Sequence, residues 1–171
     1  MKILKIKFVN KMFLNFFVKL HNFSYKIISR LAILENGGIH PKHKIMNYHK
    51  FFIDNIDSND EILDIGCGTG GLTTRFAQMC KHVYAVDISK SMIFQLAHKA
   101  KTQGLNNVTM VQSGFLTYKH QGKELDAIIA NINLHHLPDF WKQIALCRFF
   151  DLLKNGGKLF LADVVFDFDP R

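Results

Sequence analysis

The sequence predicts an α/β fold: a single domain built on a doubly wound parallel sheet with helices on both faces. Short apolar runs without polar alternation recur along the chain, and such runs are typical of strands buried on both faces. Segments with helical periodicity lie between them, which implies right-handed crossovers between parallel strands. A hydrophobic fraction of 48% in 171 residues supports a real core, and 21% charged residues argue against disorder.

The predicted strands and helices follow one another between residues 56 and 165. Strands are expected over residues 61–65, 82–87, 107–112, 125–131 and 158–165. Helices are expected over residues 71–80, 90–102 and 138–153. A further helix, from about residue 44 to residue 55, precedes the first of these strands and ends at a polar turn.

Residues 1–55 form the predicted N-terminal extension, and residues 56–171 form the predicted body. The first 34 residues hold seven of the 22 basic residues and none of the 14 acidic ones. Apolar side chains at helical spacing, from Met12 to Leu20, predict a helix that stands apart from the sheet. This helix is expected to pack on the body or to make a peripheral contact with an anionic membrane surface, with a nucleic-acid arm as a third alternative.

Several absences narrow the class of protein. No uncharged run approaches the ~20 residues that a membrane span requires, and no signal peptide is recognisable. The three cysteines suit a reducing compartment, so the predicted location is cytoplasmic. His40, His43 and His49 are not expected to bind a metal, because no cysteine or carboxylate lies among them.

The most informative segment is a glycine-dense turn at residues 61–71, which follows an apolar strand. Asp64 lies two residues before the first glycine, and a second apolar strand ends on Asp87. The carboxyl ends of neighbouring parallel strands meet at one edge of a sheet, so the two acids flank the glycine turn. This arrangement predicts a site for a nucleoside ligand.

The charge of Asp64 helps to identify that ligand. A dinucleotide would place its pyrophosphate on the helix that begins near Leu72, close to the Asp64 carboxylate. At ~4 Å and an effective dielectric constant of ~20, each like-charge pair costs about 4 kcal/mol. S-adenosylmethionine (SAM) fits better, because it carries an ammonium group, a sulfonium and a carboxylate but no phosphate. An oxidoreductase that uses NAD or a nucleotide sugar remains the alternative.

Four segments resemble a known family. ILDIGCGTGG at 62–71 closely resembles motif I of the class I SAM-dependent methyltransferases, and VYAVDIS at 83–89 resembles their second motif. LDAIIANINLHHLPD at 125–139 and LLKNGGKLFLADVVF at 152–166 resemble the motifs of the fourth and fifth strands. The resemblance implies a Rossmann-like sheet with the strand order 3-2-1-4-5 and SAM as the cofactor.

The resemblance also implies roles for the residues of the first two motifs. The glycines at positions 66, 68 and 70 would let the backbone approach the methionyl part of SAM. Asp64 would accept hydrogen bonds from the ammonium group, directly or through water. Asp87 would bind the two ribose hydroxyls.

The adenine end of the expected site combines apolar and polar residues. Ile88 and Met92 would pack against adenine or ribose, although Met92 is equally expected as ordinary helix core. After the third strand, many relatives carry an acid where this chain has Gln112-Ser113-Gly114-Phe115. Ser113, Gly114 and the amide of Phe115 would contact adenine in its place. We expect weaker adenine recognition, by ~1–2 kcal/mol for the lost charged hydrogen bond.

The segment from Asn131 to His136 is expected to face the transferred methyl group. It resembles the LHHL loop of small-molecule methyltransferases. His135 or His136 would remove a proton from the acceptor, since imidazole titrates near neutrality. The alternative is that these histidines hold the loop by hydrogen bonds, and this alternative is stronger for His136 than for His135.

Relatives of this class continue into a sixth and a seventh strand, the last of them antiparallel, whereas this chain stops at Arg171. The expected sheet therefore lacks these strands, and its open edge is covered by the N-terminal region or by a partner such as a second copy. The leading hypothesis is a methyltransferase that acts on a small-molecule acceptor. A SAM-binding module without turnover is the alternative. No nucleic-acid partner is expected, because the body beyond residue 34 is nearly neutral.

Overall fold

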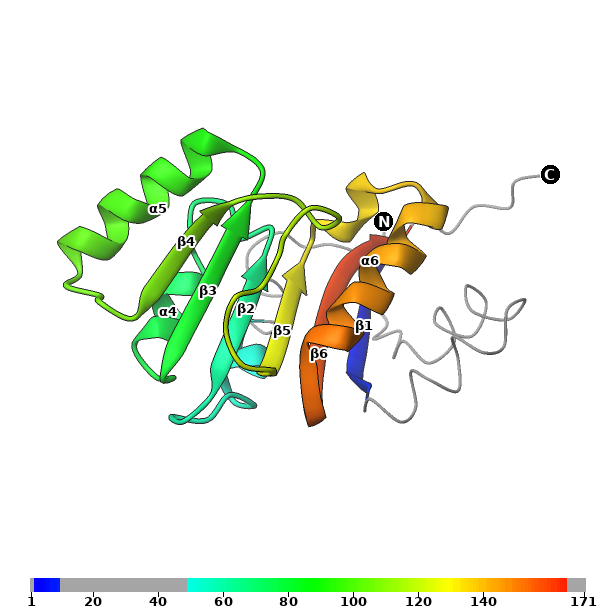
Figure 1. Ribbon diagram of the computed structural model, residues 1–171, viewed down its shortest axis with the longest axis horizontal. Helices are drawn as coiled ribbons and strands as arrows, with labels where there is room; N and C mark the ends of the chain where they lie inside the picture. The colour runs from blue at the N-terminus through cyan, green and yellow to red at the C-terminus, as the bar shows by residue number, and fades with distance from the viewer. Residues whose placement is uncertain (1, 10–48, 166–171) are drawn as a thin grey trace.

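The computed structural model describes residues 2–9 and 49–165, which form one sheet flanked by helices (Figure 1). The strands are β1 (Lys2–Val9), β2 (Glu61–Ile65), β3 (His82–Asp87), β4 (Val108–Gln112), β5 (Leu125–Asn131) and β6 (Leu153–Val165). The helices are α4 (Thr73–Ala77), α5 (Lys90–Thr102) and α6 (Asp139–Leu152), with a 3-10 turn η1 (Leu134–His136). Residues 49–53 are also helical.

The sheet has the order β1-β6-β5-β2-β3-β4. β2 pairs in parallel with β3 on one side and with β5 on the other, and β4 and β6 extend the parallel set outward. These five strands reproduce the predicted order 3-2-1-4-5, so the predicted α/β Rossmann-like fold is confirmed. The order of strand addition reverses at β2, which lies between β3 and β5, and the five parallel strands all point their carboxyl ends to one edge of the sheet.

Apolar side chains cover both faces of the central strands. On one face, α6 packs Ala145 and Phe149 against β2 and β5. On the other face, α4 contributes Phe76, and the helical segment before β2 contributes Phe52. Burial on both faces explains why the central strands are continuous apolar runs.

α5 illustrates how local sequence sets the limits of an element. The Ser89 side chain accepts a hydrogen bond from the Met92 N–H at 3.4 Å and caps the amino end of the helix. Lys99 and Lys101 lie in the last turn, where cations interact favourably with the helix dipole. Gly104, with φ of +67°, supplies the left-handed residue that follows the helix.

The structure corrects the prediction that the first 34 residues are helical and separate from the sheet. Lys2–Val9 forms β1, an edge strand that runs antiparallel to β6, with Lys2 opposite Val165. Charged and apolar residues alternate from Lys5 to Phe8, and the strand ends on the apolar Val9. This pattern suits an edge strand once a partner strand is present. β1 thus covers the edge that was expected to be open, as one of the two alternatives proposed.

The predicted helix from Met12 to Leu20, and with it the membrane contact, lies outside the described residues. The division at residue 55 and the self-association of the chain stay predictions. No helix in the described part of the chain combines the length and the apolar character needed to cross a membrane.

Two other elements differ from prediction by three residues or more at one end. α4 begins at Thr73 instead of residue 71, because the glycine turn continues as far as Leu72, and it ends at Ala77 instead of residue 80. β6 begins at Leu153 instead of residue 158, directly after α6, and it contains Gly156 and Gly157. A side chain at Gly157 would lie 3.0 Å from the Leu125 carbonyl oxygen, so this bulged start of the strand requires glycine.

Candidate active site

A cavity of about 640 Å³ opens at the carboxyl ends of the parallel strands, and we call it the carboxyl-end cavity. Nine of the residues considered in the sequence analysis line it: Gly66, Gly68, Asp87, Ile88, Met92, Ser113, Gly114, Phe115 and His136. Asp64, Gly70, Asn131 and His135, which were also predicted, are not in its lining. Lining residues that sequence reasoning did not single out include Thr117, Ile132 and Asn133.

The glycine turn can exist only without side chains at two of its positions. Gly66 and Gly70 have φ values of +73° and +79°, in the region that favours glycine. A Cβ atom at Gly66 would overlap the amide of Asn133, and one at Gly70 would overlap the side chain of Leu96. Gly66 therefore forms the wall of the cavity, and Gly70 is needed for packing against α5.

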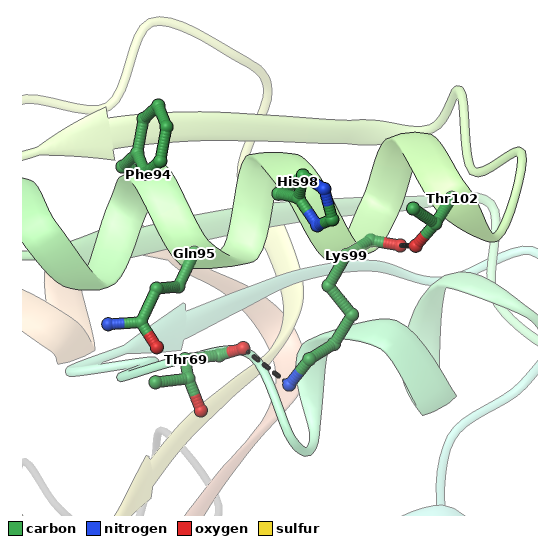
Figure 2. Close-up of a pocket in the computed structure, with 6 residues that line it drawn as sticks. All are labelled: Thr69, Phe94, Gln95, His98, Lys99 and Thr102. Carbon is green, nitrogen blue, oxygen red and sulfur yellow. Dashed lines mark hydrogen bonds between the residues drawn. The ribbon is translucent and has the colours of Figure 1, made fainter.

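A lysine supports the same turn from its outer side. Figure 2 shows Lys99 reaching from α5 to Thr69, where its Nζ donates a hydrogen bond of 2.8 Å to the carbonyl oxygen. Gln95 lies on the same side of the helix, and the group borders an open hollow of about 380 Å³. Lys99 thereby fixes the turn against α5 without entering the carboxyl-end cavity.

Asp87 is held in place by two backbone amides. Its Oδ2 accepts a hydrogen bond from the Gly68 N–H at 2.9 Å, and its Oδ1 accepts one from the Ser89 N–H at 2.8 Å. A carboxylate offers about four lone-pair sites, so each oxygen can accept another hydrogen bond. Asp87 lines the cavity and is therefore a fixed double acceptor, suited to a pair of neighbouring hydroxyls.

Asp64 is placed differently from Asp87. It is 2% exposed and lies behind the glycine turn, where Thr73 Oγ1 donates a hydrogen bond of 2.6 Å to its Oδ2. Burial raises the pKa of Asp64 to about 6, against the effect of the Thr73 hydrogen bond and with a smaller contribution from the Asp87 charge. Asp64 is thus an internal charge beneath the cavity.

The loop after β4 forms the wall opposite β5. The Ser113 N–H donates to the Asp87 carbonyl oxygen at 3.0 Å, and Thr117 Oγ1 accepts from the Gly114 N–H at 3.0 Å. Thr117 therefore already accepts a hydrogen bond from the Gly114 N–H, one of the groups that were expected to contact adenine. Ile88, which is 77% exposed, gives the cavity an apolar rim on this side.

The loop after β5 carries backbone strain. Ile132 has a φ of +53°, which is rare for a β-branched residue, and its N–H donates a hydrogen bond of 2.6 Å to the Ala162 carbonyl oxygen. The left-handed residue turns Asn133 toward the glycine turn, where its Nδ2 donates to the carbonyl oxygens of Ile65 and Gly66 at 2.5 and 3.2 Å. Asn133 thus closes the cavity wall.

Two side-chain acceptors near the cavity lack a hydrogen bond. Oδ1 of Asn131 and Oδ1 of Asn133 are buried and have no partner among the described residues. An orphaned buried acceptor costs roughly 1–3 kcal/mol, so a ligand that donates hydrogen bonds would be favoured here. The ammonium group of SAM is such a donor. Together with the double acceptor Asp87 and the side-chain-free turn, this set of residues fits SAM.

The two histidines of η1 have different surroundings. His136 lines the cavity, whereas His135 pairs with Asp163 of β6. Asp163 Oδ2 accepts from the His135 N–H at 2.8 Å, and Oδ1 lies 2.6 Å from the His135 Nδ1. The two imidazole rings are 4.1 Å apart between centroids. No group of three His, Cys, Asp or Glu in the described part of the chain is arranged to hold a metal.

A family model described as a methyltransferase domain matches residues 62–157, more than half of the chain. An uncharacterized methyltransferase of Geobacillus sp. is 33% identical over 105 residues, which are 61% of this chain and 47% of the relative. One from Anoxybacillus flavithermus is 31% identical over 109 residues, which are 64% and 49%. The chain spans about half the length of these curated relatives.

Solved structures with the same fold have various described activities. A Streptococcus mutans protein in complex with S-adenosylhomocysteine (SAH) has a TM-score of 0.58 at 23% identity and covers 70% of this chain and 71% of its own. An rRNA methylase from Streptococcus thermophilus scores 0.56 at 22% identity and covers 71% of both chains. Coclaurine N-methyltransferase scores 0.60 at 21% identity and covers 73% of this chain and 37% of its own. The resemblance seen in the sequence motifs is confirmed, including SAM as the cofactor of the class.

Proposed function

Since the chain belongs to the methyltransferase domain family, we propose that it binds SAM in the carboxyl-end cavity and transfers the methyl group to a small-molecule acceptor. The observation that carries the proposal is Asp87, whose two oxygens are fixed by the Gly68 and Ser89 amides at the cavity wall. A fixed double acceptor next to a glycine turn suits a ribose, and a buried Asp64 beneath the same turn favours a cation over a pyrophosphate.

The residues of the cavity divide the ligand into three parts. Asp87 would hold the ribose hydroxyls. Gly66 and Gly68 would lie along the methionyl part, with the orphaned Oδ1 of Asn133, a lining residue, as the partner proposed for the ammonium group. Adenine would lie between Ile88 with Met92 and the loop of Ser113, Gly114 and Phe115.

SAM supplies an electrophilic methyl group when it is bound, so the protein has to provide position and a place for a proton. Ile132 and Asn133 shape the wall beside the β5 loop. We propose that His135, with Asp163 on one ring nitrogen, takes this proton. His135 is not a lining residue, but its ring lies 4.1 Å from the ring of His136, which lines the cavity. His136, next to His135, lines the cavity and would contact the methyl acceptor.

The choice of a small-molecule acceptor is supported by the charge of the body. Residues 35–171 hold 15 basic and 14 acidic residues, whereas a nucleic-acid surface requires an excess of positive charge. If the acceptor were RNA, an assay with radiolabelled SAM would place the labelled methyl group in the nucleic-acid fraction.

Isothermal titration calorimetry with SAM, SAH and NAD⁺ tests the cofactor. We expect SAM and SAH to bind and NAD⁺ to give no heat beyond dilution, and tighter binding of NAD⁺ would refute the proposal. Turnover is tested with SAM that carries a radiolabelled methyl group and a protein-free cell extract. Label in a small organic molecule supports the acceptor class, and SAM binding with no transfer to any fraction indicates a binding module instead.

A further inference from the structure

A buried carboxylate outside the predicted site makes two contacts with one histidine. Asp163 is 6% exposed and lies near the carboxyl end of β6, while His135 lies in η1 after β5. One oxygen of Asp163 accepts from the His135 backbone N–H at 2.8 Å, and the other lies 2.6 Å from the ring Nδ1. Bonds to both the backbone and the ring fix the side chain of His135 against rotation.

The chemistry of this pair determines which ring nitrogen carries hydrogen. An ionised carboxylate can only accept hydrogen bonds, so a neutral His135 must carry its hydrogen on Nδ1. The lone pair then resides on Nε2, which points away from the buried carboxylate because the two ring nitrogens lie on opposite sides of the ring. The side chain of His135 remains 28% exposed, so the ring is open on a side that Asp163 does not cover.

The location of the pair relates it to the cavity. The His135 ring is 4.1 Å from the ring of His136, which lines the cavity. The Ile132 N–H bond to the Ala162 carbonyl oxygen joins the same loop to β6, one residue before Asp163. The loop after β5 is thus joined to β6 at two points, at Ile132 and at His135.

We propose that Asp163 is a positioning residue, which holds His135 as the Nδ1–H tautomer so that Nε2 can take a proton from the methyl acceptor. This inference rests on the proposed function. Nε2 takes the proton from an O–H or N–H group of the methyl acceptor. A lone pair of that oxygen or nitrogen bonds to the methyl carbon, while the carbon–sulfur bond breaks and its electron pair stays on sulfur. The proton then passes from Nε2 to water. An acceptor that must lose a proton is therefore favoured over one that is already an anion.

The competing explanation is that Asp163 only caps η1 through the backbone N–H of His135. Asparagine separates the two explanations. In Asp163→Asn, the side-chain oxygen can still accept from the backbone N–H, while the amide NH₂ donates to Nδ1 and moves the ring hydrogen to Nε2. The cap is retained and the tautomer is reversed.

The first test is long-range ¹H–¹⁵N NMR of the histidine rings in the full chain, with His135→Gln used to assign the signals. We expect a protonated Nδ1 and an unprotonated Nε2 for neutral His135 in the wild type, and the reverse in Asp163→Asn. A wild-type ring protonated on Nε2, or a tautomer unchanged in the variant, would overturn the inference. Asp126→Asn is the matched control, because Asp126 also accepts a backbone N–H, from Glu61 at 3.0 Å.

The second test measures methyl transfer from radiolabelled SAM to the protein-free extract, together with SAH affinity. We expect Asp163→Asn and His135→Gln each to lose about 100-fold or more in transfer, the double variant to lose no more than His135→Gln, and SAH affinity to change less than about two-fold. Losses that multiply in the double variant, or wild-type transfer in Asp163→Asn, would contradict the positioning role. A wild-type chain that fails to bind SAH would refute the proposed function, while the tautomer experiment would still decide the role of Asp163 toward His135.

Discussion

The two ends of the parallel sheet carry hollows of the same volume, about 640 Å³ each, but of different chemistry. At the amino ends of the strands, Glu61 pairs with Lys81 at 2.6 Å and Asp126 pairs with Lys154. At the carboxyl ends, the Asn131 and Asn133 oxygens are orphaned and the Ile132 backbone is strained. The size of a hollow therefore does not distinguish the two ends of the sheet, whereas unsatisfied and strained groups do.

The difference also appears in the pKa values of the acids at the two ends. The hydrogen bond from Lys81 lowers the pKa of Glu61, whereas burial raises the pKa of Asp64 to about 6. The acid at the amino end is stabilised by its surroundings in the charged form. The acid at the carboxyl end is destabilised in that form, which is expected where a cationic ligand supplies the missing interaction.

Asp87→Ala should give the largest effect. The variant loses a charged acceptor for two hydroxyls, and it also releases the Gly68 and Ser89 amides. At about 1.5–3 kcal/mol for each hydrogen bond to a charged group, we expect SAM affinity to fall by roughly 100-fold or more. Asp87→Asn should lose less, because the amide oxygen still accepts. Calorimetry would measure the SAM affinity of each variant. Equal, negligible losses of affinity in both variants would mean that Asp87 does not hold the ribose.

Asp64→Asn should increase stability at neutral pH. The folded-state pKa of about 6 lies above the ordinary value of 3.8 for an aspartate, so the folded protein binds the proton more tightly than the unfolded chain. The contribution of this group to stability is therefore full below pH ~4 and is lost as the pH rises through 6. By this measure the free energy of unfolding of the variant at pH 7 exceeds that of the wild type by on the order of 2–3 kcal/mol, and this difference should vanish near pH 4. Urea unfolding measures it.

The same titration should govern ligand affinity in the opposite sense. An ionised Asp64 attracts a cationic ligand, so SAM binding to the wild type should strengthen as the pH rises from 5 to 7. This pH dependence should disappear in Asp64→Asn. A variant whose SAM affinity keeps the wild-type pH dependence would remove Asp64 from ligand binding.

Asn133→Ala is expected to have a moderate effect. The substitution removes the two bonds to Ile65 and Gly66 that close the cavity wall, along with one orphaned oxygen. Removal of an orphaned acceptor offsets part of the loss of the two hydrogen bonds, so the free energy of unfolding should change by less than about 1.5 kcal/mol. SAM affinity should fall by roughly ten-fold. The matched control is Asn107→Ala, since Asn107 also bonds backbone carbonyl oxygens, those of Ala77 and Cys80, but away from the cavity.

The sequence predicted the central strands, because burial on both faces leaves a signal in their own residues. The strand before the glycine turn and the strand that ends on Asp87 have the predicted limits, because central strands buried on both faces are continuous apolar runs. β1 was missed because an edge strand is stabilised by its partner, and β6 lies at the opposite end of the chain.

The site residues that were missed depend on backbone conformation and on long-range contacts. The positive φ of Ile132 brings Asn133, and not Asn131, into the cavity lining, and nothing in an isoleucine indicates that conformation. Asp163 is visible as an acid in the last strand, but its pairing with His135 crosses 28 residues and depends on the neighbouring strands β5 and β6.

The smallest effect on the ligand is expected from Glu61→Gln, at the amino end. The lowered pKa of Glu61 means that this acid stabilises the fold when it is ionised. The contribution is full above the ordinary pKa of 4.5 for a glutamate and is lost as the pH falls through the folded-state pKa. The variant should therefore be slightly less stable than the wild type at pH 7, and this difference should shrink at pH 3, the reverse of Asp64→Asn. Its SAM affinity should be unchanged, because the pair with Lys81 lies at the far end of β2 from the glycine turn. Parallel urea unfolding and SAM calorimetry at both pH values would test this, and a loss of SAM affinity in Glu61→Gln would show that the two ends of the sheet are coupled.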